Sequence, residues 1–261
     1  MHHMVPDKKL IAGSFSKKAG SYGSYAQIQR LALQKCAQYA QELHGNTAFA
    51  IDLGCGTGLY EEISGAVSHK MVCLDIAGQC LKRINTGSAF SNPCVCADIE
   101  MLPFKKQVFE MAVLASVLQW LSSPGIALQH INGILCLGGT VLYAIFLKGS
   151  FNELNETQQE YAMKNPVHFF SLDECKCLFN TAGFRISVQE TLQHTQYFNS
   201  PLAALKSLAG TGSTAVGGNR LRGHELFDFC RTYDKRYRGE NGVPVTYHLL
   251  VGRAEKIRNT L

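Results

Sequence analysis

Three features that are absent from this sequence of 261 residues limit the classes of protein to which it can belong. It has no stretch of about eighteen uncharged apolar residues, so we expect no membrane-spanning helix. Its N-terminus lacks the charged-then-apolar layout of a secretory signal, which favours a cytoplasmic protein. Its ten cysteines lack the two-residue spacing of metal ligands, because Cys94 and Cys96, like Cys175 and Cys177, are separated by one residue. We therefore interpret them as small hydrophobic residues of a reducing cytosol and predict no metal.

Positive charge is concentrated near the C-terminus. The net charge is +5, and residues 201–261 contain ten Lys or Arg against five Asp or Glu, so the first 200 residues balance. An acidic partner for this region is one interpretation, and solvated helix faces are the other. Charge alone favours the second.

A glycine-rich loop is the strongest local signal. An apolar run over 48–51 ends at Asp52, and Gly54, Gly56 and Gly58 follow at alternate positions before a helix-forming segment. Glycine allows positive φ and lets a ligand approach the backbone without a Cβ in the way. The order predicts a strand, a tight turn and a helix.

Two later aspartates strengthen this interpretation. Asp75 ends the apolar run 71–74, and Asp98 ends the run 93–97. Successive parallel strands would bring Asp52, Asp75 and Asp98 to the same edge of a sheet, where an acidic side chain can accept hydrogen bonds from ribose hydroxyls. A nucleotide-like ligand is therefore expected.

The spacing of the loop distinguishes between nucleotide-like ligands. A dinucleotide site has G-x-G-x-x-G, whereas this loop reads D-x-G-x-G-x-G over 52–58. Asp52 would repel a pyrophosphate but suits a ligand that carries an amine and a sulfonium cation. The loop resembles motif I of the class I S-adenosylmethionine-dependent methyltransferases, which implies S-adenosylmethionine as cofactor and S-adenosylhomocysteine as product. NAD binding is the alternative.

The rest of the chain fits the α/β fold of that superfamily, a seven-stranded, mostly parallel Rossmann-like sheet with an antiparallel last strand. We expect strands at 48–52, 71–75, 94–97, 109–115, 140–147, 184–192 and 245–254. A helix over 27–43 precedes them. Pro124 is well placed as the first residue of another helix, which runs to about Leu135 and which Gly138-Gly139 should break. Ser171 and Glu174 form a capping-box pattern before a helix that Gly183 ends.

The interval between the last two strands is too long for a plain loop. It contains helical patches at 201–208 and 224–233, and we interpret it as a helical lid above the C-terminal edge of the sheet, with a disordered insertion as the alternative. The expected units are an N-terminal arm and helix (1–45), a cofactor-binding α/β domain (46–192), the lid (193–244), and the final strand with the tail (245–261).

The composition of the lid indicates which chemical group accepts the methyl group. Its arginines can hold a carboxylate in a bidentate fork. A carboxylate is already a nucleophile at neutral pH and needs only alignment and loss of hydration. The chain has no N-P-P-Y after 109–115, no cysteine-based acceptor motif and no acid–lysine–acid set for a metal, and these absences favour a carboxylate acceptor.

Five segments across almost the whole chain carry a more specific resemblance. They are 15–30, the glycine loop 52–58, Leu118-Gln119-Trp120, Leu205-Lys206-Ser207-Leu208-Ala209-Gly210-Thr211-Gly212, and Pro244-Val245-Thr246-Tyr247-His248. In these segments the chain resembles the malonyl-[acyl-carrier protein] O-methyltransferases of biotin synthesis. The resemblance implies methyl transfer to the free carboxylate of a malonyl thioester on acyl carrier protein, on the way to pimelate. That carrier is acidic and would face the basic C-terminal region; no nucleic acid or membrane partner is expected.

The implied roles can be assigned by residue. The methionine moiety is expected at the glycine loop, at Asp52, Gly54, Cys55, Gly56 and Gly58. The ribose and one adenine face are expected at Asp75 and Ile76, and the adenine amine and edge at Asp98 and Ile99. Ser116 is expected to close the pocket beneath the sulfonium. Tyr22 would close the pocket from the arm, or pack as a simple anchor. For the acceptor carboxylate we favour an arginine among Arg220, Arg222, Arg236 and Arg238, with His168 and Tyr143 as weaker candidates. Gln119 and Trp120 fit either the site or helix packing.

Two rival functions remain compatible with the loop. One is a methyltransferase of the same fold that acts on a small lipid-like or quinone acceptor. The other is a protein that binds S-adenosylmethionine but assembles or modifies a partner without methyl transfer.

Overall fold

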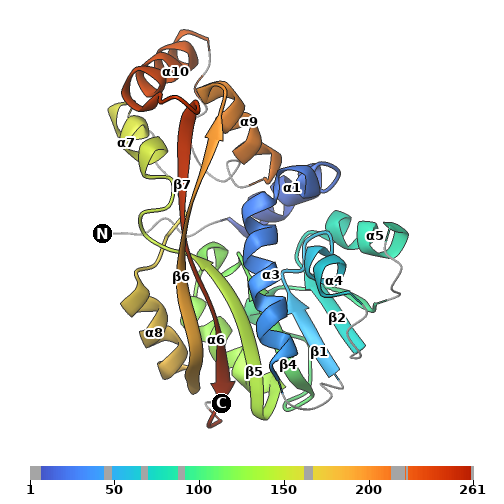
Figure 1. Ribbon diagram of the computed structural model, residues 1–261. Coiled ribbons are helices and arrows are strands. Elements are labelled where there is room, and N and C mark those ends of the chain that lie inside the picture. The colour runs from blue at the N-terminus through green and yellow to red at the C-terminus, as the bar shows by residue number, and fades with distance from the viewer. Residues whose placement is uncertain are drawn as a thin grey trace.

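The computed structural model describes residues 7–43, 49–65, 70–87, 92–161, 167–212, 221 and 223–259. A seven-stranded sheet in the order β3-β2-β1-β4-β5-β7-β6 forms its centre, with helices on both faces (Figure 1). The first five strands pair in parallel with one another, and β7 is antiparallel to both β5 and β6. The expected α/β fold with its antiparallel last strand is confirmed.

The elements have the following bounds. The strands are β1 (Phe49–Leu53), β2 (Lys70–Asp75), β3 (Cys94–Cys96), β4 (Phe109–Ala115), β5 (Leu135–Phe146), β6 (Phe184–Phe198) and β7 (Val243–Lys256). The α-helices are α1 (Lys8–Lys18), α2 (Tyr22–Tyr25), α3 (Gln27–Gln41), α4 (Leu59–Ser64), α5 (Gly78–Gly87), α6 (Pro124–Ile134), α7 (Asn152–Glu160), α8 (Leu172–Thr181), α9 (Pro201–Gly210) and α10 (His224–Tyr237). Two short 3₁₀ helices are η1 (Ile99–Met101) and η2 (Leu118–Trp120).

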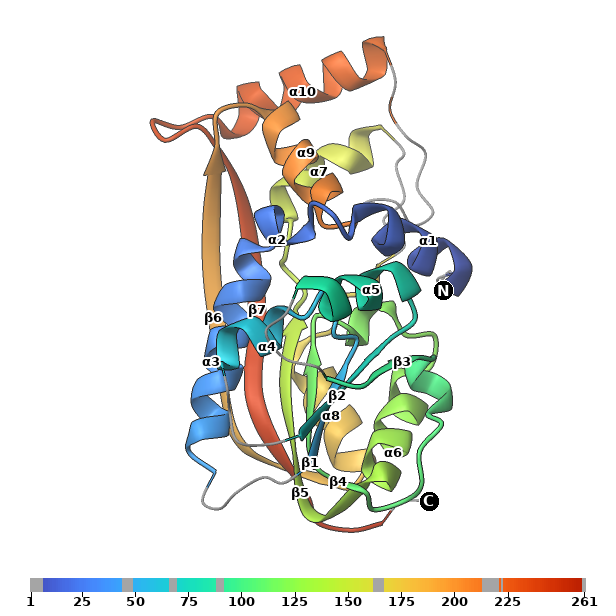
Figure 2. The same cartoon turned by 90° about the vertical axis from the view of Figure 1, so that its right-hand side faces the viewer.

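The side chains of β5 show how the sheet separates two cores. Leu142 and Ala144 belong to the core that includes Cys36 of α3, whereas Tyr143 and Ile145 belong to the core that includes Ile131 of α6. Successive residues of a strand point to opposite faces, so each face of the sheet is covered by its own layer of helices. Both layers are visible on either side of the sheet in Figure 2.

Local capping signals in the sequence are confirmed. Pro124 is the first residue of α6. The Ser171 side chain accepts a hydrogen bond from the Glu174 N–H at 3.2 Å, and the Ser171 N–H donates to the Glu174 carboxylate at 2.7 Å. This reciprocal pair starts α8 as the capping box predicts.

The expected end of the helix near Leu135 is confirmed, because α6 ends at Ile134, but the role given to Gly138-Gly139 was wrong. Strand β5 begins at Leu135 instead of residue 140, so the two glycines lie inside a strand. Gly138 has φ 77°, and a Cβ on Gly139 would lie 2.8 Å from the Cys136 carbonyl oxygen. The pairing register between β4 and β5 shifts here, so these glycines form a strand irregularity.

The last two strands extend beyond the rest of the sheet and carry helices at their far end. Strand β6 continues to Phe198 and β7 begins at Val243, so 193–198 pair with 243–248 as strand instead of joining the lid. Helices α9 and α10 cap this ribbon, with α7 beside them (Figure 1). Helices α1 and α2 lie between this helical cap and α5 (Figure 2). No described helix is long and apolar enough to cross a membrane.

Candidate active site

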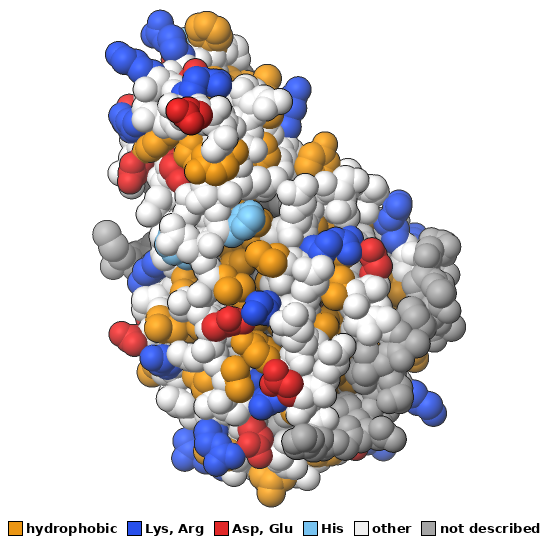
Figure 3. All heavy atoms as spheres, in the orientation of Figure 1, with side chains coloured by type: hydrophobic (Ala, Val, Ile, Leu, Met, Phe, Trp, Pro, Cys, Tyr) orange, Lys and Arg blue, Asp and Glu red, His pale blue; other side chains and the backbone are white. Residues whose placement is uncertain are grey.

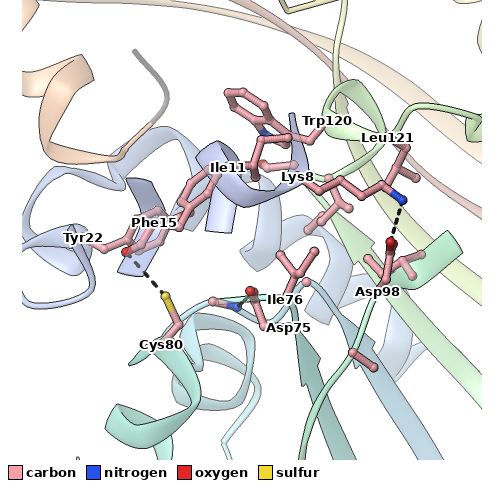
Figure 4. A pocket seen from close by; sticks show the side chains of 17 residues that line it. Lys8, Ile11, Phe15, Tyr22, Asp75, Ile76, Cys80, Asp98, Trp120 and Leu121 are labelled. Atoms are coloured by element: carbon pink, nitrogen blue, oxygen red, sulfur yellow. Dashed lines mark hydrogen bonds and ion pairs between the residues drawn. The ribbon is translucent and has the colours of Figure 1, made fainter. Parts of the chain in front are cut away.

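A pocket lies at the carboxyl ends of β1, β2, β3 and β4, beneath α1 (Figure 4). Its empty volume, including the open mouth, is ≈ 790 Å³. Eight residues expected at the site line it: Tyr22, Gly54, Gly56, Asp75, Ile76, Asp98, Ile99 and Ser116. Three others expected to hold the cofactor, Asp52, Cys55 and Gly58, belong to the same loop but do not line the pocket.

The glycine loop forms the floor of the pocket. The N–H groups of Gly54 and Cys55 both donate to the Leu74 carbonyl, at 2.7 and 3.0 Å, which fixes the loop against the end of β2. Gly54 has φ 77°, and a Cβ there would lie 2.4 Å from Cγ2 of Val117. Gly56 has φ 56° and open space where its Cβ would stand. A side chain at Gly54 would thus disturb packing, whereas one at Gly56 would enter open space.

Asp75 connects the floor to the end of β2. Its carboxylate accepts the Gly56 N–H at 2.8 Å and the Ala77 N–H at 2.7 Å. Burial raises the pKa of this carboxyl, while backbone N–H groups oppose that shift by stabilising the charged form. Each carboxylate oxygen can accept a second hydrogen bond, so Asp75 can still receive ribose hydroxyls.

Asp98 occupies the neighbouring strand end. One oxygen accepts the Glu100 N–H at 2.9 Å and so caps η1, and the other accepts the Lys8 ammonium at 2.5 Å. Figure 4 shows this ion pair at the end of the pocket away from Tyr22. The predicted convergence of Asp52, Asp75 and Asp98 on one sheet edge is confirmed by the strand register, although Asp52 is buried behind the loop.

Asp52 lies in a buried acidic pair that sequence reasoning missed. Glu61 of α4 is 4% exposed, and its Oε1 accepts the Cys73 thiol at 3.1 Å. Burial raises the pKa of Asp52 well above its usual range, reinforced by the charges of Glu61 and Asp75, and burial also raises the pKa of Glu61. Because two neighbouring buried carboxylates repel each other when both are ionised, the state in which the pair keeps one proton is favoured.

The wall opposite Asp75 comes from the segment after β4. Ser116 has φ 59°, and its buried hydroxyl has no partner among the described residues. Its backbone is held from both sides, because its N–H donates to the Ala144 carbonyl at 2.7 Å and its carbonyl accepts the Gln119 amide at 2.9 Å. Gln119 is therefore a buried supporting residue, while Trp120 lines the pocket itself.

The N-terminal arm forms the roof. Lys8, Ile11 and Phe15 of α1 line the pocket together with Tyr22 of α2. The ring of Phe15 packs edge-on against Trp120, with centroids 5.5 Å apart. Burial, and next the charge of Asp75, raises the pKa of the Tyr22 phenol, so Tyr22 presents a neutral hydroxyl. The sequence suggested an arm ordered over another element, but gave no signal for Lys8 or Ile11.

Of the four arginines expected at the acceptor, the two that the structure describes do not line the pocket. Arg236 pairs with Glu160 at 2.5 Å, and Arg238 pairs with Asp234 at 2.5 Å; all four side chains are at least a third exposed. Arg220 and Arg222 lie outside the described residues. Of the weaker candidates, Tyr143 is buried in the α6-side core and His168 packs edge-on against Phe170.

These residues fit S-adenosylmethionine. The unpartnered Ser116 hydroxyl and the open space at Gly56 leave room and a hydrogen-bonding group beside the glycine loop. Asp75 and the buried Asp52–Glu61 pair supply negative charge near a cation, and Ile76 and Ile99 supply apolar walls for a flat ring. No group of three or more His, Cys, Asp or Glu within the described ranges is arranged to hold a metal ion.

Comparison with known proteins agrees with this geometry. Residues 51–143 match the family model described as a methyltransferase domain. The malonyl-[acyl-carrier protein] O-methyltransferase of Geobacter sulfurreducens is 26% identical over 94% of this chain and 98% of its own. The protein of the same name from Herminiimonas arsenicoxydans is 29% identical over 97% of both chains.

Solved structures share the fold at low identity. A putative methyltransferase from Bacillus halodurans aligns with a TM-score of 0.64 at 13% identity, over 85% of this chain and 99% of its own. An N-methyltransferase from Bradyrhizobium japonicum in complex with S-adenosylhomocysteine aligns with a TM-score of 0.52 at 12% identity, over 90% and 88%. These structures show the shared fold. The methyltransferase-domain match and the full-length relatives identify the chain as a class I S-adenosylmethionine-dependent methyltransferase.

Proposed function

We propose that this protein transfers a methyl group to the free carboxylate of a malonyl thioester on acyl carrier protein, the step that the sequence resemblance places in biotin synthesis. One observation carries the proposal: relatives that match end to end, including one from Erwinia pyrifoliae at 27% identity over 96% of this chain and 94% of its own, are malonyl-[acyl-carrier protein] O-methyltransferases. The match extends through the lid.

The pocket residues have proposed positions along the cofactor. The loop of Gly54 and Gly56, backed by Asp52, Cys55 and Gly58, would hold the methionine moiety. Asp75 and Ile76 would hold the ribose and one adenine face, and Asp98 and Ile99 the adenine amine and edge. Ser116 would donate its hydroxyl near the sulfonium, because that hydroxyl has no partner among the described residues.

The chain needs no general base for this chemistry. When bound, S-adenosylmethionine supplies a methyl group that the carboxylate oxygen attacks, while the electron pair of the broken carbon–sulfur bond stays on sulfur. The carboxylate is ionised at neutral pH, so the protein must align it and remove its hydration. The roof formed by Ile11, Phe15 and Tyr22 excludes water from one side of the pocket.

The carrier-protein partner is proposed from the relatives and not from charge on the lid. Over 193–244 the sequence has seven Lys or Arg against four Asp or Glu: Lys206, Arg220, Arg222, Arg231, Lys235, Arg236 and Arg238 against Glu225, Asp228, Asp234 and Glu240. Figure 3 shows both signs interspersed at the top of the molecule, where α10 lies. Arg231 pairs with Asp228 and Arg238 with Asp234, so part of this charge is paired within the lid, and charge alone does not identify an acidic partner.

The experiment offers the purified protein methyl-labelled S-adenosylmethionine with malonyl-acyl carrier protein, and in parallel with acetyl-acyl carrier protein, which has no free carboxylate. We expect label on the malonyl carrier only, and mild base should release it because it is an ester. Label on a quinone or lipid acceptor and none on the malonyl carrier would contradict the proposal. Cofactor binding without any transfer would favour a non-methylating role.

A further inference from the structure

The first residue of α1 makes the one ion pair within the described lining of the pocket. The Lys8 ammonium lies 2.5 Å from Oδ2 of Asp98 and contacts Oε2 of Glu100 at least as closely. Burial alone would lower the pKa of Lys8, but hydrogen bonds to the two carboxylates outweigh it, and the pKa lies above its usual value. Lys8 therefore stays charged and bridges both acids.

The two acids that Lys8 contacts, Asp98 and Glu100, bind different backbone segments around the pocket. Asp98 lines the pocket and caps η1 through the Glu100 N–H. Glu100 is 8% exposed and accepts the N–H groups of Ser122 at 3.3 Å and Ser123 at 2.5 Å. Glu100 thereby holds the segment that precedes α6. Through Asp98 and Glu100, Lys8 connects α1 both to the segment that follows β3 and to the start of α6.

Farther along, α1 connects the pocket to the helical cap. The buried Ser14 hydroxyl donates to the Gly212 carbonyl at 2.8 Å, just beyond the end of α9. A Cβ on Gly212 would come within 3.2 Å of the Phe15 ring, so the two segments are in close contact. Helix α1 is anchored by Lys8 at one end of the pocket and by Ser14 at the cap.

We propose that Lys8 is a positioning residue for the cofactor, which fixes the Asp98 carboxylate and holds α1 closed over the bound ligand. The inference rests on the proposed function, because it takes Asp98 as the residue that receives the adenine amine. The bridge need not open for this contact. Each oxygen of Asp98 now accepts one hydrogen bond from the protein, and each has capacity for a second.

The contacts of Lys8 predict how its removal should change cofactor binding. Without Lys8, α1 loses its anchor and Asp98 loses its orientation, so the ligand should leave faster while the chemical step is unchanged. The side chains of Lys8 and Asp98 are 33% and 23% exposed, which weakens the ion pair by solvent screening. A moderate effect on affinity is therefore expected.

The test uses S-adenosylhomocysteine as the probe and the full chain. Lys8→Met should raise its dissociation constant about five- to tenfold, mainly through a faster dissociation rate. Lys9→Met is the matched control: it removes the same charge from the adjacent, exposed position of the same helix and should change the dissociation constant by less than about twofold. Lys8→Arg should restore most of the affinity because a guanidinium can also bridge two carboxylates.

Three readouts separate this role from a purely structural one. Lys8→Met should raise the KM for S-adenosylmethionine and leave kcat nearly unchanged, and the ligand-free melting temperature should match that of Lys9→Met. In an Asp98→Asn background, Lys8→Met should weaken binding less than it does in the unmodified protein, because only the contact with Glu100 remains to be lost. Equal dissociation constants for Lys8→Met and Lys9→Met, or full additivity with Asp98→Asn, would overturn the inference. If the unmodified protein does not bind the probe, the proposed function itself fails.

Discussion

The floor and the roof of the pocket are built in different ways. The floor is made by strand ends that lie next to each other in the sheet, and its contacts are backbone hydrogen bonds such as those of Gly54 and Cys55 to Leu74. The roof is made by side chains that meet across long stretches of sequence, as Lys8 meets Asp98 and Ser14 meets Gly212. The floor is fixed by the core of the domain, whereas the roof depends on a few polar contacts.

This difference predicts an order of sensitivity. Changes in the floor should damage the fold or abolish binding, whereas changes in the roof, such as Lys8→Met, should alter how fast the ligand leaves. The roof is drawn from the part of the chain with fewer buried apolar contacts, which is where local opening is usual.

The largest effect is expected for Gly54→Ala. The positive φ and the 2.4 Å approach to Val117 Cγ2 should together lower the free energy of unfolding by about 2–4 kcal/mol. Gly56→Ala is the matched variant, because it also has positive φ but open space at its Cβ. It should lower stability by only about 1–2 kcal/mol and instead obstruct ligand binding. Urea unfolding and calorimetric titration with S-adenosylhomocysteine measure both; equal losses of stability would contradict this packing.

The second largest effect is expected when the Asp75 carboxylate at the end of β2 is removed. Asp75→Ala should weaken cofactor binding at least about tenfold, because a charge-assisted hydrogen bond to ribose contributes roughly 1.5–3 kcal/mol. The loop N–H of Gly56 also loses its acceptor. Asp75→Asn retains one acceptor oxygen and should lie between the two. Affinity unchanged in Asp75→Ala, measured by the same titration, would mean that the ligand does not contact this strand end.

The smallest effect lies behind the floor. Burial raises the pKa of Glu61, so its contribution to stability is complete below the ordinary carboxyl pKa and is lost as pH rises through the raised value. Glu61→Gln cannot ionise and should be more stable than the unmodified protein at pH 8, by on the order of 1 kcal/mol, with the difference shrinking at pH 5.

The control for this prediction is Glu62→Gln on the same helix. Glu62 is 63% exposed and pairs with Arg30 at 3.1 Å, so its removal should show no gain at pH 8. Urea unfolding at the two pH values measures both variants. A gain for Glu61→Gln that is the same at pH 5 as at pH 8 would show that ionisation of Glu61 is not its cause.

The same contrast explains what the sequence could predict. Strand ends and their aspartates follow from local periodicity, so the sequence predicts that Asp75, Asp98 and Ser116 lie at one edge of the sheet. All three line the pocket, and their roles toward the cofactor stay predictions. Lys8 has no local signature, because its partners lie some ninety residues away. Glu61 falls in the first turn of a helix, a position where an acid is usually solvent-exposed, and only the fold buries it. Gly138-Gly139 suggested a helix end, since a strand irregularity has the same composition.

The most direct test of the account is a crystal structure with S-adenosylhomocysteine bound. The account predicts ribose hydroxyls within hydrogen-bonding distance, about 3 Å, of the Asp75 carboxylate, adenine between Ile76 and Ile99 with its amine at Asp98, and α1 closed above them. Ligand density in another part of the molecule, or a ligand in this pocket that touches neither Asp75 nor Asp98, would contradict it.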